Sequence, residues 1–407
     1  MTVSPLAPKS FPTLAGIDGV TLSTAASGMK YQGRDDMLLM RLDDAAVMAA
    51  VFTGSDTAAA PVDWCRQRLS NGTAPRAILV NAGNANAFTG AGGMAAVAIC
   101  CGAVAAALGC EADAVMMAST GVIGEPLDTG YLTPHIPAMA NDDASWQAAA
   151  EAIRTTDTFA KGACASATIG DRTVQISGIA KGSGMIAPDM ATMLGFIATD
   201  ANLPQPVLAA LLGDATQRSF NAITVDSDTS TNDSVFLVAT GAAGNTPPAG
   251  ADDPALAGFR AALDQVMQDL ARQIVRDGEG ATKFITIDVG GAADDQAARR
   301  IGLAVANSPL VKTAIAGEDA NWGRIVMAVG KAGAAIDQSR LQISIGGILI
   351  AAGGTRVEDY DEAPVAAHMK GAEISISLRV GDGRGAARIW TCDLTHGYIS
   401  INADYRS

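Results

Sequence analysis

Seven clusters of Gly, Thr and Asn lie along the chain, and none of them contains Cys or His. Backbone amides and hydroxyls in tight glycine turns can hold a small polar substrate and stabilise an oxyanion. The same residues also form ordinary turns, and this interpretation suits any one cluster taken alone. Seven together favour a substrate site. The clusters are Asn81–Gly90, Ser119–Gly124, Thr155–Thr158, Lys181–Leu194, Thr224–Asp233, Asp277–Lys283 and Gly317–Arg324.

The familiar nucleotide and hydrolase motifs are missing from the sequence. It contains no G-x-x-x-x-G-K-[ST], no H-E-x-x-H and no G-x-S-x-G. Gly182, Gly184 and Ala187 spell G-x-G-x-x-A, but Pro188 follows where a phosphate-binding helix should continue. A dinucleotide site is therefore not expected.

Metal sites have equally little support in the sequence. The run from Asp226 to Asn232 starts like a calcium loop, but its sixth position is Thr231 and its twelfth is Leu237. Six cysteines form no C-x-x-C pair and only three histidines are present, so zinc is not expected. We expect the cysteines to be small buried side chains in a reducing compartment, and His396 to be a packed or surface histidine.

Composition narrows the class of protein further. The 407 residues carry 28 Lys+Arg and 42 Asp+Glu, a net charge of −14, which argues against nucleic acid and anionic membrane surfaces as partners. Hydrophobic residues make up 49%, enough for a sizeable core. Every apolar stretch of 18 residues is interrupted by Gly or charge, so we expect no membrane span. The start, MTVSPLAPKSFPTLAG, has no apolar signal region, and a cytoplasmic location follows as an expectation.

Strands and helices are predicted along the whole length, which favours a layered α/β or α+β architecture. The Gly- and Pro-rich stretch from Gly241 to Ala255 is predicted to be a surface loop rather than a domain linker. Apolar and β-branched runs predict strands at 77–80, 173–176, 235–239, 284–289, 341–350, 373–380 and 387–392. Three- and four-residue periodicity predicts helices at 92–108, 144–154, 204–220, 254–276 and 309–316.

Two long motifs make the sequence resemble a known family. KGSGMIAPDMATML begins at Lys181, and SPLVKTAIAGEDANWGR runs from Ser308 to Arg324. With the other clusters they resemble the ornithine acetyltransferase family, the ArgJ-type glutamate N-acetyltransferases, from Ser4 to Ser407. The resemblance implies a layered α/β sheet-and-helix sandwich of the ornithine acetyltransferase and DmpA-like type. In that fold two self-cleaved fragments build one unit.

The resemblance also implies a cut between Ala191 and Thr192, which gives an α chain of residues 1–191 and a β chain of residues 192–407. A Thr hydroxyl is a weak nucleophile that needs a base. Cleavage would turn the nitrogen of Thr192 into an α-amino group, whose pKa of about 7.7–8 suits proton exchange near neutral pH. Thr192 is thus the expected nucleophile, and without the resemblance nothing distinguishes it from a helix N-cap or a core hydroxyl.

Other site residues are carried over from the same resemblance. Thr120 and Gly121 supply the oxyanion hole. Lys181 is expected to bind the substrate carboxylate, and Glu279 the cationic side chain of ornithine. The chain terminus is expected to be ordered over the active site. The expected substrate contacts are Thr155 (or Thr156 if the segment differs in length), Lys181, Thr192, Glu279, Asn402 and Ser407.

The implied reaction is ping-pong transfer of acetyl from N2-acetylornithine to glutamate, without metal or organic cofactor, by an α2β2 assembly. Acetyl-CoA as a second donor is left open. One alternative is a self-processing aminopeptidase or amidohydrolase of the N-terminal-nucleophile type; another is a silent small-molecule binding protein. The sequence departs from the family pattern at Phe88, Ser227 and Asp189, and we expect Asp189 to alter the rate of self-cleavage.

Overall fold

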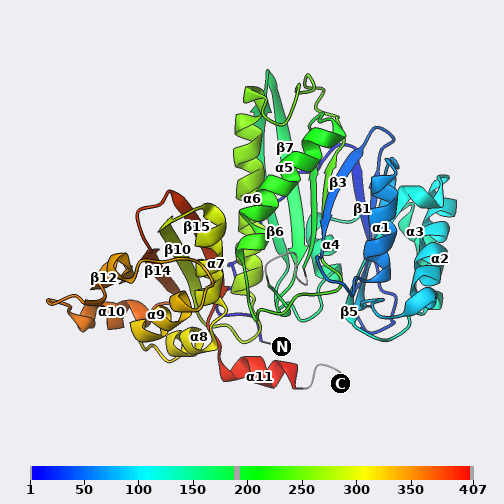
Figure 1. Cartoon of the computed structure of the whole chain (residues 1–407). Coiled ribbons are helices and arrows are strands. Elements are labelled where there is room, and N and C mark those ends of the chain that lie inside the picture. Colours follow the sequence, from blue (N-terminus) through cyan, green and yellow to red (C-terminus); the bar gives the residue numbers. More distant parts are fainter. Residues whose placement is uncertain (1, 188–192, 404–407) are drawn as a thin grey trace. The chain divides into compact units, whose positions relative to one another are not determined.

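The computed structural model describes residues 2–187 and 193–403, which form two compact units (Figure 1). The larger unit comprises the described residues within 9–221 and 228–274, and the smaller unit those within 1–8, 222–227 and 275–407. Sheets and helices occur in both, which confirms the predicted α/β class. The loop from Gly241 to Ala255 lies within the larger unit and is no linker, as predicted.

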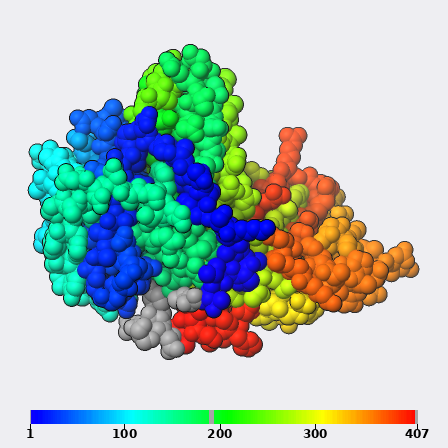
Figure 2. Space-filling model, turned by 180° about the vertical axis from the view of Figure 1, so that it is seen from behind, coloured from blue at the N-terminus to red at the C-terminus, as the bar shows by residue number. Residues whose placement is uncertain are grey.

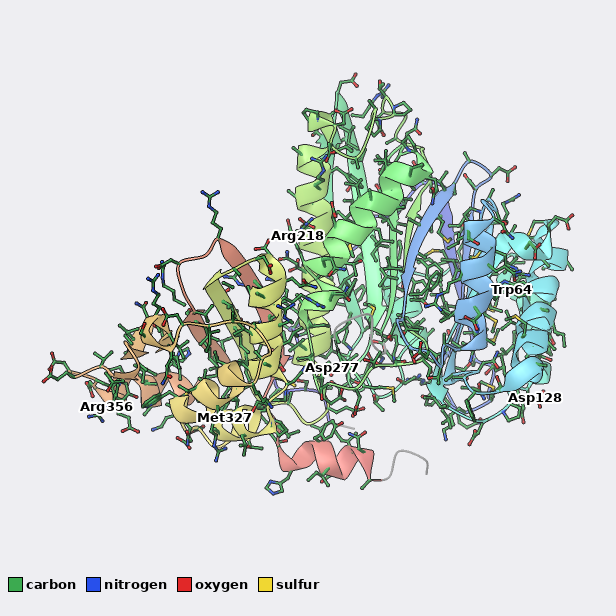
Figure 3. The ribbon with its side chains drawn as sticks, viewed as in Figure 1. Trp64, Asp128, Arg218, Asp277, Met327 and Arg356 are labelled. Atoms are coloured by element: carbon green, nitrogen blue, oxygen red, sulfur yellow. The ribbon has the colours of Figure 1, made fainter. Side chains whose placement is uncertain are left out.

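A four-stranded sheet of order β1-β2-β4-β5 forms one layer of the larger unit. Its strands are β1 Val20–Ala25, β2 Met37–Leu42, β4 Ala77–Asn84 and β5 Val115–Val122, and only β4 and β5 run parallel. Helices α1 (Ala60–Ser70) and α2 (Gly90–Leu108) pack against it. Trp64 of α1 donates its Nε1 to the carbonyl oxygen of Val115 at 2.9 Å, which ties this helix to β5 (Figure 3).

A five-stranded sheet of order β3-β9-β8-β7-β6 forms the second layer of this unit. Its strands are β3 Val47–Phe52, β6 Lys161–Ile169, β7 Arg172–Lys181, β8 Leu194–Thr199 and β9 Ser234–Ala239. Strand β8 runs antiparallel to β7 and parallel to β9. Strands from both sides of the Ala191–Thr192 bond therefore build a single sheet. The remaining helices of the unit are α3 Ile136–Met139, α4 Trp146–Ala152, α5 Gln205–Gln217 and α6 Ala257–Arg276.

One hydrophobic core joins the two sheets of the larger unit. It combines buried residues of β2 and β4 with Phe196 of β8 and Phe236 of β9, whose rings stack at 5.7 Å. The periodic apolar residues of α6, from Phe259 to Ile274, are buried, as the predicted helix requires. Burial on both faces explains why the central strands read as continuous apolar runs.

The smaller unit is built around a six-stranded sheet of order β13-β12-β11-β14-β10-β15. Its strands are β10 Phe284–Ala292, β11 Gln342–Ile345, β12 Ile348–Ala352, β13 Thr355–Arg356, β14 Glu373–Arg379 and β15 Gly385–Cys392. Helix α7 packs on β10 and β15. The helices of this unit are α7 Asp295–Ala306, α8 Pro309–Ala316, α9 Trp322–Gly330, α10 Glu362–Met369 and α11 His396–Asn402.

The single strand predicted over 341–350 is in fact the hairpin of β11 and β12. Gly346 and Gly347 form its turn with φ of 62° and 79°, conformations that glycine adopts at little cost. Because apolar residues flank the two glycines, the sequence pattern reads as one strand and does not show the turn.

Helix α2 bears on the expectation of no membrane span but does not overturn it: its 19 residues are long and apolar enough to cross a membrane by length and composition alone, as the core helix of a globular protein can also be. Its glycines do not interrupt the helix, and it carries no charged residue. Seven of its residues are buried, among them Cys100, Cys101 and Val104 in the hydrophobic core of the larger unit. Figure 2 shows the cyan region that includes α2 at the surface, so we interpret α2 as a half-buried core helix.

Candidate active site

The carboxyl end of β7 and the amino ends of β8 and β9 meet at one edge of the five-stranded sheet. Leu194, the first residue of β8, pairs with Lys181 on β7 and with Ser234 on β9. Thr192 precedes Leu194 by two positions in sequence. Ala191 and Thr192 themselves lie outside the described residues, so only the sequence relates the predicted nucleophile to this edge.

Lys181 reaches the predicted oxyanion residue Thr120. Its Nζ donates a hydrogen bond to Thr120 Oγ1 at 3.1 Å, and both residues are buried. A hydroxyl can accept one bond and still donate its own hydrogen, whereas an ammonium only donates. Lys181 thus polarises Thr120 Oγ1 and leaves its hydrogen available for a developing oxyanion.

Gly121 occupies a position that only glycine can fill. Its φ is 135°, and a Cβ there would lie 2.2 Å from the carbonyl carbon of Gly83. The close approach coincides with an irregularity in the pairing of β4 and β5 at Asn84. The backbone of β5 is therefore irregular at Gly121, whose N–H is the predicted donor to the oxyanion.

Buried Asn and Ser side chains fix the end of β5 next to Thr120. Ser119 Oγ donates to Asn81 Oδ1 at 2.6 Å, and Asn81 Nδ2 donates to the carbonyl of Asn84 at 2.9 Å. From the other sheet, Asn232 Nδ2 donates to the carbonyls of Ala85 and Ser119 at 2.6 and 2.9 Å. The polar clusters 81–90 and 224–233 thus hold the end of β5, which carries the predicted oxyanion residue Thr120, in a fixed position.

Asp157 anchors Lys181 from the opposite side, and no sequence motif singles this residue out. Its fully buried carboxylate accepts from Lys161 Nζ and from the Gly182 N–H, both at 2.6 Å, and its Oδ2 lies 4.0 Å from Lys181 Nζ. Burial raises the pKa of Asp157, but Lys161, Lys181 and these hydrogen bonds outweigh it and hold the pKa well below its usual range. The spacing of four residues between Asp157 and Lys161 was the available signal.

The same carboxylate orders the predicted contact residue Thr155, whose backbone N–H donates to Asp157 Oδ2 at 3.1 Å. The hydroxyl of the alternative residue, Thr156, is hydrogen-bonded to Ser183 Oγ at 2.7 Å and is buried. Thr155 is half-buried and remains the predicted substrate contact, with Thr156 as its alternative.

The smaller unit brings together another two of the predicted residues. Asn402 of α11 donates its Nδ2 to Glu279 Oε2 at 2.7 Å, and Glu279 is buried. Gly280 lets the chain pass close to α11, because a Cβ there would lie 2.4 Å from the Tyr398 nitrogen. The described part of the C-terminal region includes α11, and Ser407 lies outside the described residues. His396 is exposed, as one of its two predicted states requires.

Comparisons with known proteins agree over the whole chain. The ArgJ family model matches residues 21–407. The arginine biosynthesis bifunctional protein ArgJ of Agrobacterium fabrum is 52% identical over 100% of both chains. The protein of the same name from Gluconobacter oxydans is 54% identical over 100% of this chain and 96% of the other.

The chain belongs to the ArgJ family. A crystal structure of arginine biosynthesis bifunctional protein argJ from Bacillus halodurans covers 52% of this chain and 99% of its own, with 43% identity and a TM-score of 0.50. Family membership confirms the resemblance drawn from the sequence and the enzyme class, an acyltransferase of arginine biosynthesis.

For this ArgJ-family chain, Asp157→Asn is expected to lower the free energy of unfolding by about 3–5 kcal/mol at pH 7, because it removes the buried carboxylate charge that pairs with Lys161 Nζ at 2.6 Å. Since the folded pKa of Asp157 is depressed, its stabilisation is present above the unfolded pKa of about 3.9 and is lost as pH falls below it. Urea unfolding of both proteins at pH 7 and in acid measures this difference.

The exposed residue Asp171 supplies the matched control, because its side chain is 93% exposed. Asp171→Asn is expected to change stability by less than about 0.5 kcal/mol. An Asp157→Asn protein as stable as this control at pH 7 would contradict the anchoring role.

Proposed function

We propose that this protein transfers the acetyl group of N2-acetylornithine to L-glutamate through an acetyl ester on Thr192, releasing ornithine and N-acetylglutamate. The observation that carries the proposal is the contact between Lys181 and Thr120 at the sheet edge where β8 begins, two residues after Thr192. This contact supports the proposal, because it supplies a polarised hydroxyl beside Lys181, which pairs with Leu194 two residues after the predicted nucleophile in the sequence.

The chemistry needs one proton carrier, the α-amino group that self-cleavage creates on Thr192. This amine takes the proton of the Thr192 hydroxyl as the oxygen attacks the acetyl carbonyl. Thr120 Oγ–H and the Gly121 N–H stabilise the oxyanion. The same proton then passes to the nitrogen of the leaving ornithine, and the amine of glutamate later attacks the ester.

Substrate recognition divides between charged groups of opposite sign. Lys181 supplies a cation for the α-carboxylate of the donor, in addition to its bond to Thr120. Glu279, fixed by Asn402, pairs with the cationic side chain of ornithine. Thr155 and Ser407 complete the proposed contacts.

The relatives are named bifunctional, which supports a second acetyl donor. Acetyl-CoA is that donor in our proposal. A cytoplasmic α2β2 assembly of the two fragments completes it, with no nucleic acid or membrane as a partner.

Denaturing mass spectrometry tests the proposed self-cleavage. The purified protein should yield two fragments, the second starting at Thr192, and Thr192→Ala should yield one inactive full-length chain. Release of ornithine in the absence of glutamate would instead support the amidohydrolase alternative. An intact wild-type chain that transfers acetyl groups would contradict the proposal.

The bond between Lys181 and Thr120 predicts coupled kinetic effects. Thr120→Val should lower kcat about 100-fold, because one oxyanion donor is lost. If Lys181 assists through Thr120, adding Lys181→Met to Thr120→Val should lower kcat by less than Lys181→Met does alone. Steady-state kinetics of the four proteins in this cycle measure the coupling, and additive losses would contradict it.

The carboxylate role of Lys181 has a separate readout, the KM for N2-acetylornithine. Lys181→Met should raise this KM. The exposed Lys331, changed to Met, is the matched control and should leave both constants unchanged.

A further inference from the structure

Asp233 lies directly before β9 and is fully buried in the larger unit. Its Oδ1 accepts the backbone N–H of Met193 at 2.8 Å. The N–H of the next residue, Ser234, donates to the carbonyl oxygen of Met193 at 3.2 Å. The backbone N–H and C=O of Met193 are thus both held by consecutive residues, and Met193 is the residue that follows Thr192 in the sequence.

The second carboxyl oxygen of Asp233 is buried and has no hydrogen-bond partner among the residues that the structure describes. Such an oxygen is costly, because buried polar atoms are almost always satisfied. The Thr53 hydroxyl nearby donates to the carbonyl of Ser230 instead, at 2.6 Å. The second carboxyl oxygen of Asp233 is therefore an unsatisfied acceptor that a further hydrogen-bond donor could fill.

The charges around Asp233 do not supply that donor. Burial raises the pKa of Asp233 well above its ordinary value, against the opposing effects of the Met193 N–H, Lys181 and the Thr53 hydroxyl. Lys181 is itself bonded to Thr120 and lies 4.0 Å from the carboxylate of Asp157, which also binds Lys161. Burial therefore favours the neutral form of the Asp233 carboxyl group until a cationic donor is present beside it.

Self-cleavage would create a donor at the adjoining position. The new α-amino group of Thr192 would be one residue from Met193, and consecutive Cα atoms lie about 3.8 Å apart. We propose that Asp233 is the positioning residue of the catalytic base, its second carboxylate oxygen accepting a hydrogen bond from the α-amino group of Thr192. Asp233 can have this role only if the proposed function holds, since the amine exists only after the cut.

The protons balance without any further reactant. When the amine forms, the acid proton of Asp233 passes to it and gives a carboxylate–ammonium pair. The ammonium then releases one proton to water, and the neutral amine carries the hydroxyl proton of Thr192 to the leaving nitrogen during each turnover. Asp233 stays ionised throughout and orients the base, as the third member of a catalytic triad does.

Asp233→Asn tests this role, since Asn keeps an oxygen for the Met193 N–H but loses the charge. The variant should be cut before Thr192 and keep the KM for N2-acetylornithine, while kcat falls about 10- to 100-fold. Without the carboxylate the amine pKa falls, so the acid limb of the pH profile of kcat/KM should move to lower pH. Lys181, Asp157 and Lys161 remain in both proteins and cannot cause this difference.

Asp171→Asn makes the same charge change at an exposed site and should leave kcat, KM and the pH limb unchanged. An Asp233→Asn protein with unchanged kcat and acid limb would overturn the inference. So would a folded variant that is not cut, because Asp233 would then belong to the cleavage step. If wild-type protein is not cut before Thr192, the proposed function itself fails.

A measurement on the wild-type protein covers the case in which Asp233→Asn does not fold. The α-amino group of Thr192 can be titrated by labelling it with an acylating reagent across pH and weighing the modified fragment. A neighbouring carboxylate should give an amine pKa above the value of about 8 found in model peptides. A pKa at or below that value would overturn the inference.

Discussion

The pairing register of β7, β8 and β9 is the constraint on which the candidate active site depends. Leu194 pairs with Lys181 on one side and with Ser234 on the other, so the end of β7 and the beginnings of β8 and β9 meet at one edge. A slip of one residue in β8 would turn its side chains to the opposite faces of the sheet. Its six buried residues make such a slip costly, and the edge is therefore rigid.

Buried charge is the second feature that distinguishes this edge. Asp157, Lys161 and Lys181 are all removed from solvent, which is costly unless each group is paired and hydrogen-bonded. The short bonds of Asp157 satisfy this requirement and place Lys181 next to Thr120. Burying these charges costs stability. In return, Lys181 polarises the Thr120 hydroxyl in a site of low dielectric, where electrostatic interactions are strongest.

Much of the fold could be predicted from the sequence where one periodicity dominates. Helix α6 and strand β9 follow their patterns closely, whereas β8 (LGFIAT) was missed because a glycine and a small residue weaken the β signal of a strand buried on both faces. Gly346 and Gly347 likewise divide a run that reads as one strand. Local patterns cannot show which of these segments become neighbours.

The site could be predicted only through whole-motif resemblance. Thr120, Lys181, Glu279 and Asn402 were predicted in this way, and in the structure Lys181 contacts Thr120 and Asn402 contacts Glu279. Asp157 and Asp233 were missed, because an Asp among Thr and Ser is typical of ordinary turns. Only tertiary structure shows that both carboxyl groups are buried and that one of them holds Met193.

Capture of the acyl-enzyme tests the central claim most directly. Purified protein is given N2-acetylornithine without glutamate, and its fragments are mapped by mass spectrometry. The account predicts one acetyl group on Thr192, and its transfer to form N-acetylglutamate once glutamate is added. An acetyl group on any other residue, or full transfer activity without acetylated Thr192, would contradict it.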